Sequence, residues 1–130
     1  MALDYPDNLS YYDSHEYARL EGDTATIGIT AFAVDELGDI VFLELPDAGD
    51  EVSKGETFGT VESVKAVEDL VSPVSGEVIE RNNLLLDSPE KLSEDAYEAG
   101  WMIKVKIGDP SELDDAMTSE EYSTKVEGAE

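Results

Sequence analysis

Apolar and polar residues alternate along much of the first two-thirds of the chain, which is the period of half-buried β-strands. Residues 15–22 (HEYARLEG) and 23–30 (DTATIGIT) alternate in this way on either side of the Gly22-Asp23 pair. This pattern is typical of a hairpin. Residues 39–46 (DIVFLELP) predict a further strand that its final proline ends, because proline has no amide hydrogen to donate to a sheet.

The same part of the chain predicts only one short helix. Thr30 can cap a helix over residues 31–37 (AFAVDEL), and Gly38 follows where glycine commonly ends a helix. Residues 47–63 and 70–83 mix turn glycines with Val and other strand-forming residues. They predict short strands joined by tight turns.

The pattern changes towards the C-terminus. Residues 102–107 (MIKVKI) predict a strand with its two lysines facing outward. Asp109 and Pro110 are typical N-cap and first-turn residues, so we predict a helix that starts there and has the apolar residues of 113–117 at helical spacing. Ser119 and the glutamates after it predict a further helical turn or two.

Size and charge limit the organisation and the partners. The 130 residues are the size of one ordinary domain, so we expect a single domain over residues 1–130, with residues 109–130 as a helical C-terminal extension. Eight basic residues against 32 acidic ones give a net charge of -24. Nucleic acid and anionic membranes are therefore poor partners, whereas proteins with basic docking patches are suitable ones. A salt-adapted cell would produce the same composition with no partner implied.

The chain offers few groups for catalysis. It has no cysteine, which excludes disulfides, thiolate nucleophiles and sulfur-based zinc sites. Its only histidine, His15, follows Ser14, but adjacent residues on a strand point to opposite faces and do not readily form a catalytic dyad. We expect His15 to be a turn or edge residue. The carboxylates do not follow an EF-hand pattern, so no metal site is predicted, and an enzyme is the least favoured class.

The N-terminal segment suggests where the protein is found. Residues 1–17 have neither the basic nor the apolar region of a signal peptide, and they are acidic where a mitochondrial transit peptide is rich in arginine. No apolar run approaches the length needed to span a bilayer. We expect a cytoplasmic protein of a prokaryote, with a processed form in the mitochondrial matrix as the less favoured alternative.

Residues 61–70 (VESVKAVEDL) contain a single basic residue, Lys65, in an acidic and valine-rich stretch. Valines recur there at every third position, which a helix would also allow. The density of β-branched residues and the neighbouring strands favour a hairpin with Val64 and Lys65 at its tip. No glycine or Asn-Gly pair stands at that tip, so a primed turn is not predicted.

Several segments carry a resemblance to a known family. Residues 59–80 (GTVESVKAVEDLVSPVSGEVIE) resemble the lipoyl-attachment segment of glycine cleavage system H proteins, and residues 14–30, 38–52 and 100–107 are similar to the same family in the same order. The resemblance covers nearly the whole chain. It implies a mainly β fold, a flattened two-sheet barrel of the lipoyl and biotinyl carrier type (a barrel-sandwich hybrid), with a short helix after residue 30 and C-terminal helices.

The resemblance also implies a function. Lys65 would carry lipoic acid in amide linkage, and Glu62, Ser63, Val64 and Ala66 would form the attachment motif. Such a protein is a monomeric carrier rather than an enzyme. It accepts an aminomethyl group at a pyridoxal-phosphate glycine decarboxylase (P protein), presents it to a tetrahydrofolate-dependent aminomethyltransferase (T protein) and is reoxidised by dihydrolipoamide dehydrogenase (L protein). A lipoylating enzyme is the fourth partner.

The loaded arm would end in a protonated amine on a carbon–sulfur bond that water can break, so a cleft that excludes water would protect it. Glu16 is the candidate for pairing with the ammonium, together with Ser14 and Asp69. The acids Glu62, Glu68 and Asp69 could instead be read by the lipoylating enzyme, or they could be a solvated face.

Rival interpretations share parts of this pattern. In biotin carriers the lysine normally lies between two methionines, whereas Lys65 lies between Val64 and Ala66. Lipoyl domains of 2-oxoacid dehydrogenases are shorter and lack the 100–107 strand and the C-terminal extension. An H-like protein that only relays lipoate to other proteins, and an acidic binding module with an unmodified Lys65, stay open.

Three positions depart from the family pattern. Tyr17 stands where a tryptophan is frequent, and it keeps an aromatic ring. Ala96 stands where a proline usually precedes the tyrosine, which loosens a loop and bears on the local shape of the cleft. The Glu68-Asp69 pair makes the segment after the lysine more acidic than in many members.

Overall fold

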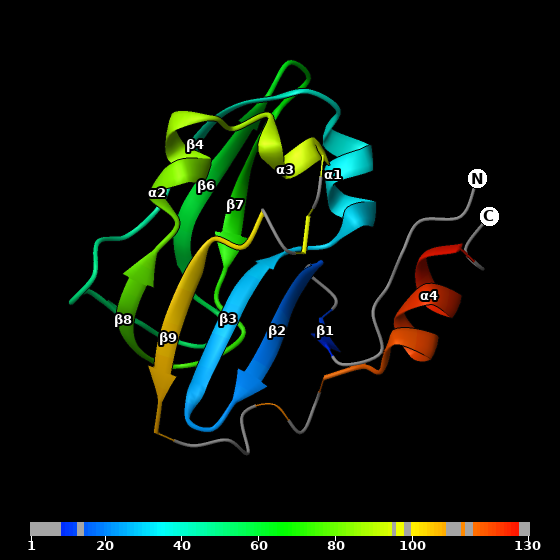
Figure 1. The fold of residues 1–130 in the computed structure, drawn as a ribbon. Coiled ribbons are helices and arrows are strands. Elements are labelled where there is room, and N and C mark those ends of the chain that lie inside the picture. Colours follow the sequence, from blue (N-terminus) through cyan, green and yellow to red (C-terminus); the bar gives the residue numbers. More distant parts are fainter. Residues whose placement is uncertain are drawn as a thin grey trace.

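Two antiparallel sheets with short helices build the fold in the computed structural model (Figure 1). The structure describes residues 9–12, 15–94, 96–97, 100–108, 113 and 116–127. The larger sheet has the strand order β1-β2-β3-β9-β8-β5, with bounds Ser10–Tyr11 (β1), Glu16–Glu21 (β2), Thr24–Ile29 (β3), Ile103–Ile107 (β9), Gly76–Arg81 (β8) and Glu51–Val52 (β5). The smaller sheet has the order β4-β6-β7, with bounds Ile40–Glu44, Thr57–Ser63 and Val67–Val71. The described strands form two sheets rather than one closed barrel, and the predicted mainly β, two-sheet fold is confirmed.

The helices in the described part of the chain are Ala31–Leu37 (α1), Asn83–Asp87 (α2), Lys91–Glu94 (α3) and Ser119–Glu127 (α4). Helix α1 confirms the prediction over residues 31–37. The Thr30 hydroxyl accepts a hydrogen bond from the Ala33 amide (3.2 Å), and the chain turns away at Gly38, which has a φ of 81°. None of the described helices is long and apolar enough to cross a membrane.

The hairpin predicted around Gly22 and Asp23 is confirmed as β2 and β3. Glu21 pairs with Thr24, so the two residues between them make the turn. Gly22 has a φ of 65°, in the left-handed region that glycine enters without steric cost. The 102–107 strand is confirmed as β9, in which Lys106 is exposed.

Helices α2 and α3 were not predicted, because four or five residues are too few to show a helical period. Leu85 and Leu92 are fully buried, so each short helix contributes one side chain to the core. Asn82 fixes the approach to α2, since its side-chain amide donates to the Trp101 carbonyl (2.7 Å) and its backbone amide to the Met102 carbonyl (2.9 Å).

The helix predicted from Asp109 is wrong at Ala116 and Met117, which are not helical, while residues 109–112 and 114–115 lie outside the described residues. Met117 instead forms a β-bridge with Tyr11, in which each amide donates to the other residue's carbonyl (2.7 and 2.9 Å). The helical turns predicted from Ser119 are confirmed as α4.

Thr118 and Glu121 explain why α4 begins at that point. The Thr118 hydroxyl accepts from the Glu121 amide (3.1 Å), and the Glu121 carboxylate accepts from the Thr118 amide (2.9 Å). This reciprocal capping box was present in the sequence as Thr118-x-x-Glu121. It is the signal that places the helix start correctly.

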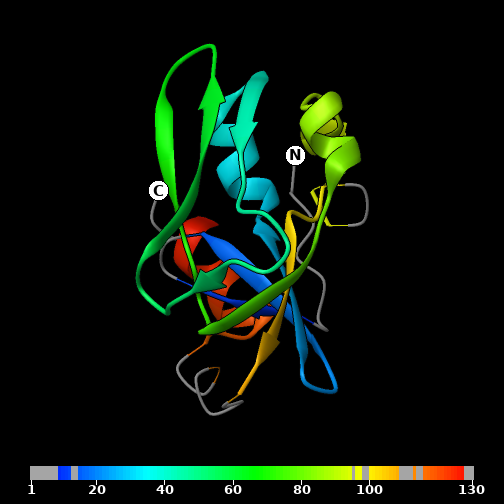
Figure 2. The same cartoon turned by 90° about the vertical axis from the view of Figure 1, so that its left-hand side faces the viewer.

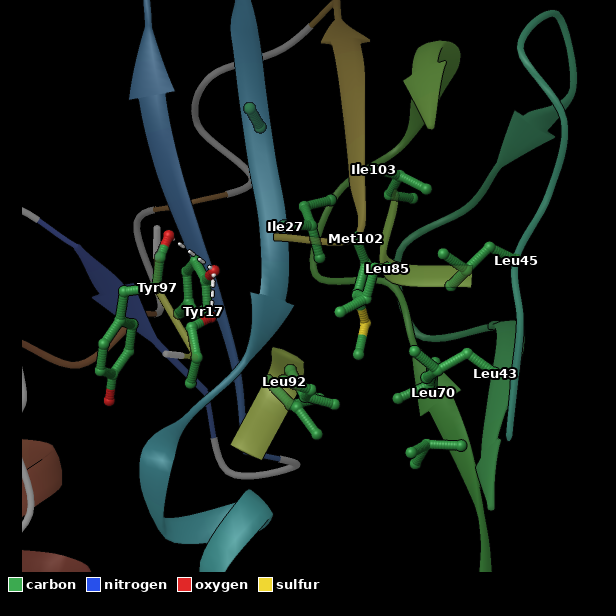
Figure 3. Packing of buried hydrophobic residues seen from close by; sticks show 14 of the residues in the cluster. Tyr17, Ile27, Leu43, Leu45, Leu70, Leu85, Leu92, Tyr97, Met102 and Ile103 are labelled. Atoms are coloured by element: carbon green, nitrogen blue, oxygen red, sulfur yellow. Dashed lines mark hydrogen bonds between the residues drawn. The ribbon is translucent and has the colours of Figure 1, made fainter. Parts of the chain in front are cut away.

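Side chains from the two sheets point toward one another across the core, and Leu85 of α2 lies between them (Figure 3). Ile27 and Ile103 come from the larger sheet, and Leu43 and Leu70 come from the smaller one. Burying a side chain of this size stabilises the fold by about 2 kcal/mol. The core therefore holds the smaller sheet firmly on the larger one.

Two of the positions that depart from the family pattern are in contact. The Tyr17 hydroxyl donates a hydrogen bond to the Ala96 carbonyl (2.9 Å), and the Tyr17 ring packs beside that of Tyr97, as Figure 3 shows. Tyr17 thus ties β2 to the loop after α3. We infer that this bond offsets some of the freedom expected from alanine at position 96.

Candidate functional site

The stretch around Lys65 forms the predicted hairpin of β6 and β7. Glu62 pairs with Val67, and residues 64–66 connect the strands. Figure 2 shows this hairpin, in green, extending beyond the other strands with its tip at the top. The described structure therefore presents Lys65 at the end of a projecting hairpin.

Ser63, the last residue of β6, holds the turn together. Its side chain is nearly buried beneath the tip, and its hydroxyl oxygen accepts hydrogen bonds from the amides of Lys65 and Ala66 (both 3.1 Å). Its own amide donates to the Ala66 carbonyl (2.8 Å). The Val64 amide donates to the Asp39 carbonyl (3.1 Å), which fastens the tip to the chain before β4. Side-chain and backbone bonds thus define the turn without glycine.

The Lys65 side chain is exposed and lies along the end of α1. Its Nζ donates to the carbonyl of Glu36 (3.4 Å), in the last turn of that helix. The α1 C-cap, Gly38, lies close beneath it: a Cβ added to Gly38 would stand 3.6 Å from Lys65 Cε. A primary amine is therefore accessible at a defined place.

A pocket of about 310 Å³ opens beside Lys65. Its walls come from the start of β2, the end of β3, helix α1 and the β6–β7 hairpin. The lining residues are His15, Glu16, Ile29, Phe32, Ala33, Glu36, Leu37, Val61, Lys65, Ala66, Glu68, Asp69 and Leu70. The lining is partly apolar and partly acidic, so it suits a ligand with a hydrocarbon part and a cationic end.

The pocket brings together five of the residues that the sequence singled out as site candidates: Glu16, Lys65, Ala66, Glu68 and Asp69. Glu62 and Val64 are exposed and do not line it. Ser63 lies below the turn. Ser14 lies outside the described residues.

Glu16 is the most deeply placed acid of the site. Its side chain is only 2% exposed, and its Oε2 accepts a hydrogen bond from the Val71 amide at the end of β7 (3.0 Å). This bond links the larger sheet to the hairpin that carries Lys65. A negative charge held so far from water attracts a cation in the pocket more strongly than it would in solution, because the surrounding dielectric constant is lower.

His15 is a turn residue, as expected, since its amide donates to the Tyr12 carbonyl (2.9 Å). It also lines the pocket, a place in the site that sequence reasoning missed. Its φ of 71° is uncommon for a residue other than glycine. Its ring lies 5.0 Å from that of Phe32 on α1, and its Nδ1 lies 2.8 Å from the hydroxyl of Tyr122 on α4. No local pattern in the sequence indicates these long-range contacts.

Comparison with known proteins connects this geometry to a family. The family model described as "Glycine cleavage H-protein" matches residues 9–129. The chain belongs to the glycine cleavage H-protein family. The family resemblance inferred from the sequence is thereby confirmed.

Curated relatives support the same family over the full length. The glycine cleavage system H protein of Acaryochloris marina is 60% identical over 128 residues, covering 98% of this chain and all of the relative. That of Nostoc punctiforme is 61% identical over 128 residues, covering 98% of this chain and 99% of the relative. The similarity therefore extends over nearly the whole of each of these relatives.

A solved structure supports the fold. The crystal structure of a glycine cleavage system H protein from Mycobacterium marinum is 36% identical, covers 95% of this chain and 98% of its own, and superposes with a TM-score of 0.82. The fold class expected from the sequence is confirmed by this neighbour.

Proposed function

We propose that this chain is the lipoyl-bearing shuttle of the glycine cleavage system and that Lys65 is its attachment site. The observation that carries the proposal is the place of Lys65: an accessible amine on a turn fixed by Ser63, beside an acidic pocket. A modifying enzyme must reach the amine directly, so the turn has to project and keep its shape. Membership of the H-protein family supports the same role.

The residues present fit a lipoyl group. When bound, this group supplies a disulfide that accepts the aminomethyl unit together with two electrons. Phe32, Leu37 and Leu70 offer apolar surface to a hydrocarbon arm that starts at Lys65. The chain provides the tether and the shelter, while the sulfur chemistry belongs to the group, in keeping with a protein that has no cysteine.

Glu16 and Asp69 hold the cationic end of the loaded arm in this proposal. Both line the pocket, and the buried Glu16 carboxylate lies where water is scarce. An ammonium paired there would be attracted more strongly than in bulk water because the surrounding dielectric constant is lower. Slower access of water would then protect the carried unit.

The partners we propose are the P, T and L proteins of the system and a lipoylating enzyme. The net charge of -24 supports partners with basic surfaces. Exposed apolar side chains near the tip, among them Phe42, Val64 and Val67, offer contact area for enzymes that act at Lys65. We also propose that this carrier is a monomer, that it is not an enzyme and that it works in the cytoplasm of a bacterium.

The intact mass of the protein produced in lipoylating cells tests the attachment site. We expect wild-type protein and Lys54→Arg to gain the mass of one lipoyl group, and Lys65→Arg to gain none. Lys54 is a suitable control because it also lies in a turn between strands. An unmodified wild-type mass, in cells shown to lipoylate other proteins, would overturn the proposal, and a biotin increment would mean a different carrier.

Glu16→Gln tests the role of the pocket. We expect the substituted protein to be lipoylated as well as wild type but to lose the aminomethyl unit to water several times faster. Glu62→Gln is the matched control, since Glu62 is exposed outside the pocket. Equal decay in wild type and Glu16→Gln would remove Glu16 from the proposed site.

A further inference from the structure

Tyr122 of the C-terminal helix contacts His15, one of the residues that line the Lys65 pocket. This tyrosine is fully buried, and its ring stacks on that of Tyr11 with centroids 4.9 Å apart. Its hydroxyl lies 2.8 Å from His15 Nδ1 and 2.7 Å from the Thr30 hydroxyl. A residue more than 90 positions away along the chain thus joins two segments that border the pocket.

Thr30 connects Tyr122 to the helical wall of the pocket. The Thr30 hydroxyl is the N-cap of α1, because it accepts from the Ala33 amide (3.2 Å). Ala33 lines the pocket, and the Glu36 carbonyl one turn further accepts from Lys65 Nζ. The position of the N-cap therefore affects the position of helix α1, which forms the wall of the pocket beside Lys65.

His15 connects Tyr122 to the acidic wall. It directly precedes Glu16, and its left-handed backbone is a conformation that a non-glycine residue keeps only when its surroundings hold it. The His15 amide donates to the Tyr12 carbonyl (2.9 Å), and the His15 carbonyl accepts from the Thr30 amide (2.9 Å). Because the His15 imidazole also contacts the Tyr122 hydroxyl, both the backbone and the side chain of His15 are fixed.

We propose that Tyr122 is a positioning residue of the Lys65 pocket: its hydroxyl fixes the Glu16 segment relative to the N-terminus of α1. Helix α4 then acts as more than an attached extension, since its tyrosine adds a side-chain link to the backbone bond between His15 and Thr30. Loss of the hydroxyl would let the His15 ring and the Thr30 cap shift relative to one another and admit water to the pocket. The effect on the carried unit rests on the proposed function, whereas the link itself rests on the geometry alone.

Tyr122→Phe tests the link, because it removes the hydroxyl and keeps the ring on Tyr11. Tyr17→Phe is the matched control: it removes a hydroxyl from an equally buried tyrosine whose bond is made to the Ala96 carbonyl, away from the pocket. NMR of the unmodified protein supplies the readout. His15 is the chain's only histidine, so its ring nitrogens are identified without ambiguity, and the Val71 amide reports the position of the Glu16 carboxylate.

We expect Tyr122→Phe to shift the His15 ring nitrogens and the Val71 amide, and Tyr17→Phe to leave both near their wild-type positions. Equal shifts in the two variants, or none in Tyr122→Phe, would overturn the proposal. If Tyr122→Phe fails to fold, Thr30→Val against Thr30→Ser tests the Thr30 half of the link, because only serine keeps the hydroxyl; valine also removes the α1 cap, so the His15 ring nitrogens are the readout.

The loaded protein supplies a second readout. We expect Tyr122→Phe to carry the lipoyl mass increment at the wild-type level but to release the aminomethyl unit several times faster than Tyr17→Phe. Lowered thermal stability with unchanged release would reduce Tyr122 to a structural role. Absence of the increment from wild type would contradict the proposed function instead, and the NMR comparison would still decide the link.

Discussion

The β2–β3 hairpin turns through glycine, whereas the β6–β7 hairpin turns through residues that a serine side chain holds in place. At the first turn Gly22 supplies a left-handed backbone, and no other atom lies within 4 Å of a Cβ added there. At the second turn the Ser63 hydroxyl accepts from the amides of Lys65 and Ala66. The first turn depends on a backbone conformation, and the second on the side chain of the strand residue that precedes the tip.

The difference explains how a functional lysine can occupy a hairpin tip. A two-residue turn needs glycine, asparagine or aspartate at positions with positive φ, which leaves little choice of side chain. Because the Ser63 hydroxyl accepts hydrogen bonds from the amides of the turn, the tip does not need glycine, asparagine or aspartate. Side chains such as those of Val64 and Lys65 can therefore occupy it and face outward. Substitutions at each of the two turns and in the strands beside them should therefore have different consequences.

Moving the lysine by one position should have the largest effect. In the double variant Lys65→Ala with Ala66→Lys, the amine starts one residue later in the turn. The amide and the carbonyl at that position are both bonded to Ser63, so the amine is displaced from its wild-type place. Because a misplacement of about 1 Å can cost a factor of about 100 in rate, we expect lipoylation to fall by about that factor or more. A time course of intact mass with a purified lipoylating enzyme measures it. Lys54→Arg, which leaves Lys65 and its turn unchanged, is the control, and wild-type rates for the double variant would refute the dependence on turn position.

Gly59→Ala should be the most destabilising single change in the lysine hairpin. A Cβ at this position would collide with the carbonyl oxygen of Glu44 on the neighbouring strand β4, a backbone atom that cannot move aside. We expect the free energy of unfolding to fall by about 3 kcal/mol. Urea denaturation measures the change, with Thr57→Ala on the same strand as the control. A loss below about 1 kcal/mol would mean that the two strands separate more easily than their packing indicates.

Ser63→Ala removes the acceptor of the amides of Lys65 and Ala66. We expect a loss of about 1–2 kcal/mol in the free energy of unfolding, since two donors near the surface would have to find water instead. Amide hydrogen exchange at these two residues should become faster, and lipoylation slower. Ser63→Thr keeps the hydroxyl and should preserve slow exchange. Unchanged exchange in Ser63→Ala would show that the turn does not depend on this side chain.

Gly22→Ala should have the smallest effect and leave the function intact. Alanine in the left-handed region costs about 1 kcal/mol, and we expect that loss in urea denaturation. The lipoyl mass increment should equal that of wild type, because the β2–β3 turn and the tip of the β6–β7 hairpin lie at opposite ends of the molecule (Figure 1). Gly22→Asn should lose less, as asparagine tolerates this conformation. Slower lipoylation of Gly22→Ala would mean that the two hairpins are coupled.

Much of the fold could be predicted from local patterns. The β2–β3 hairpin, the Thr30 cap and the lysine hairpin all depend on residues within a few positions of one another. The two helices after β8 could not be predicted, because tertiary contacts of Leu85 and Leu92 rather than a period hold them. The helical turns predicted from Ser119 are confirmed as α4, whereas the Asp109-Pro110 signal did not reveal that Met117 pairs with Tyr11 as a β-bridge.

The candidate site shows the same limit. Lys65 and its neighbours were visible because they form one continuous segment, and Glu16 and Asp69 entered through the family resemblance. Tyr122 could not be found, since nothing in the sequence near residue 122 points to a segment at residues 15–30. Contacts of such long separation come from packing of the whole chain, which local pattern does not encode.

The resting place of Lys65 has a consequence for the arm. The free ammonium carries three donors and a positive charge, and it lies on the carbonyl of Glu36 at the C-terminal end of α1, where helix carbonyls carry partial negative charge. Acylation would leave a neutral amide with one N–H and no charge to attract. Modification would therefore weaken the contact of the side chain with the Glu36 carbonyl as well as lengthen the side chain. The amide bond that attaches the lipoyl group would thus also make the Lys65 side chain more mobile.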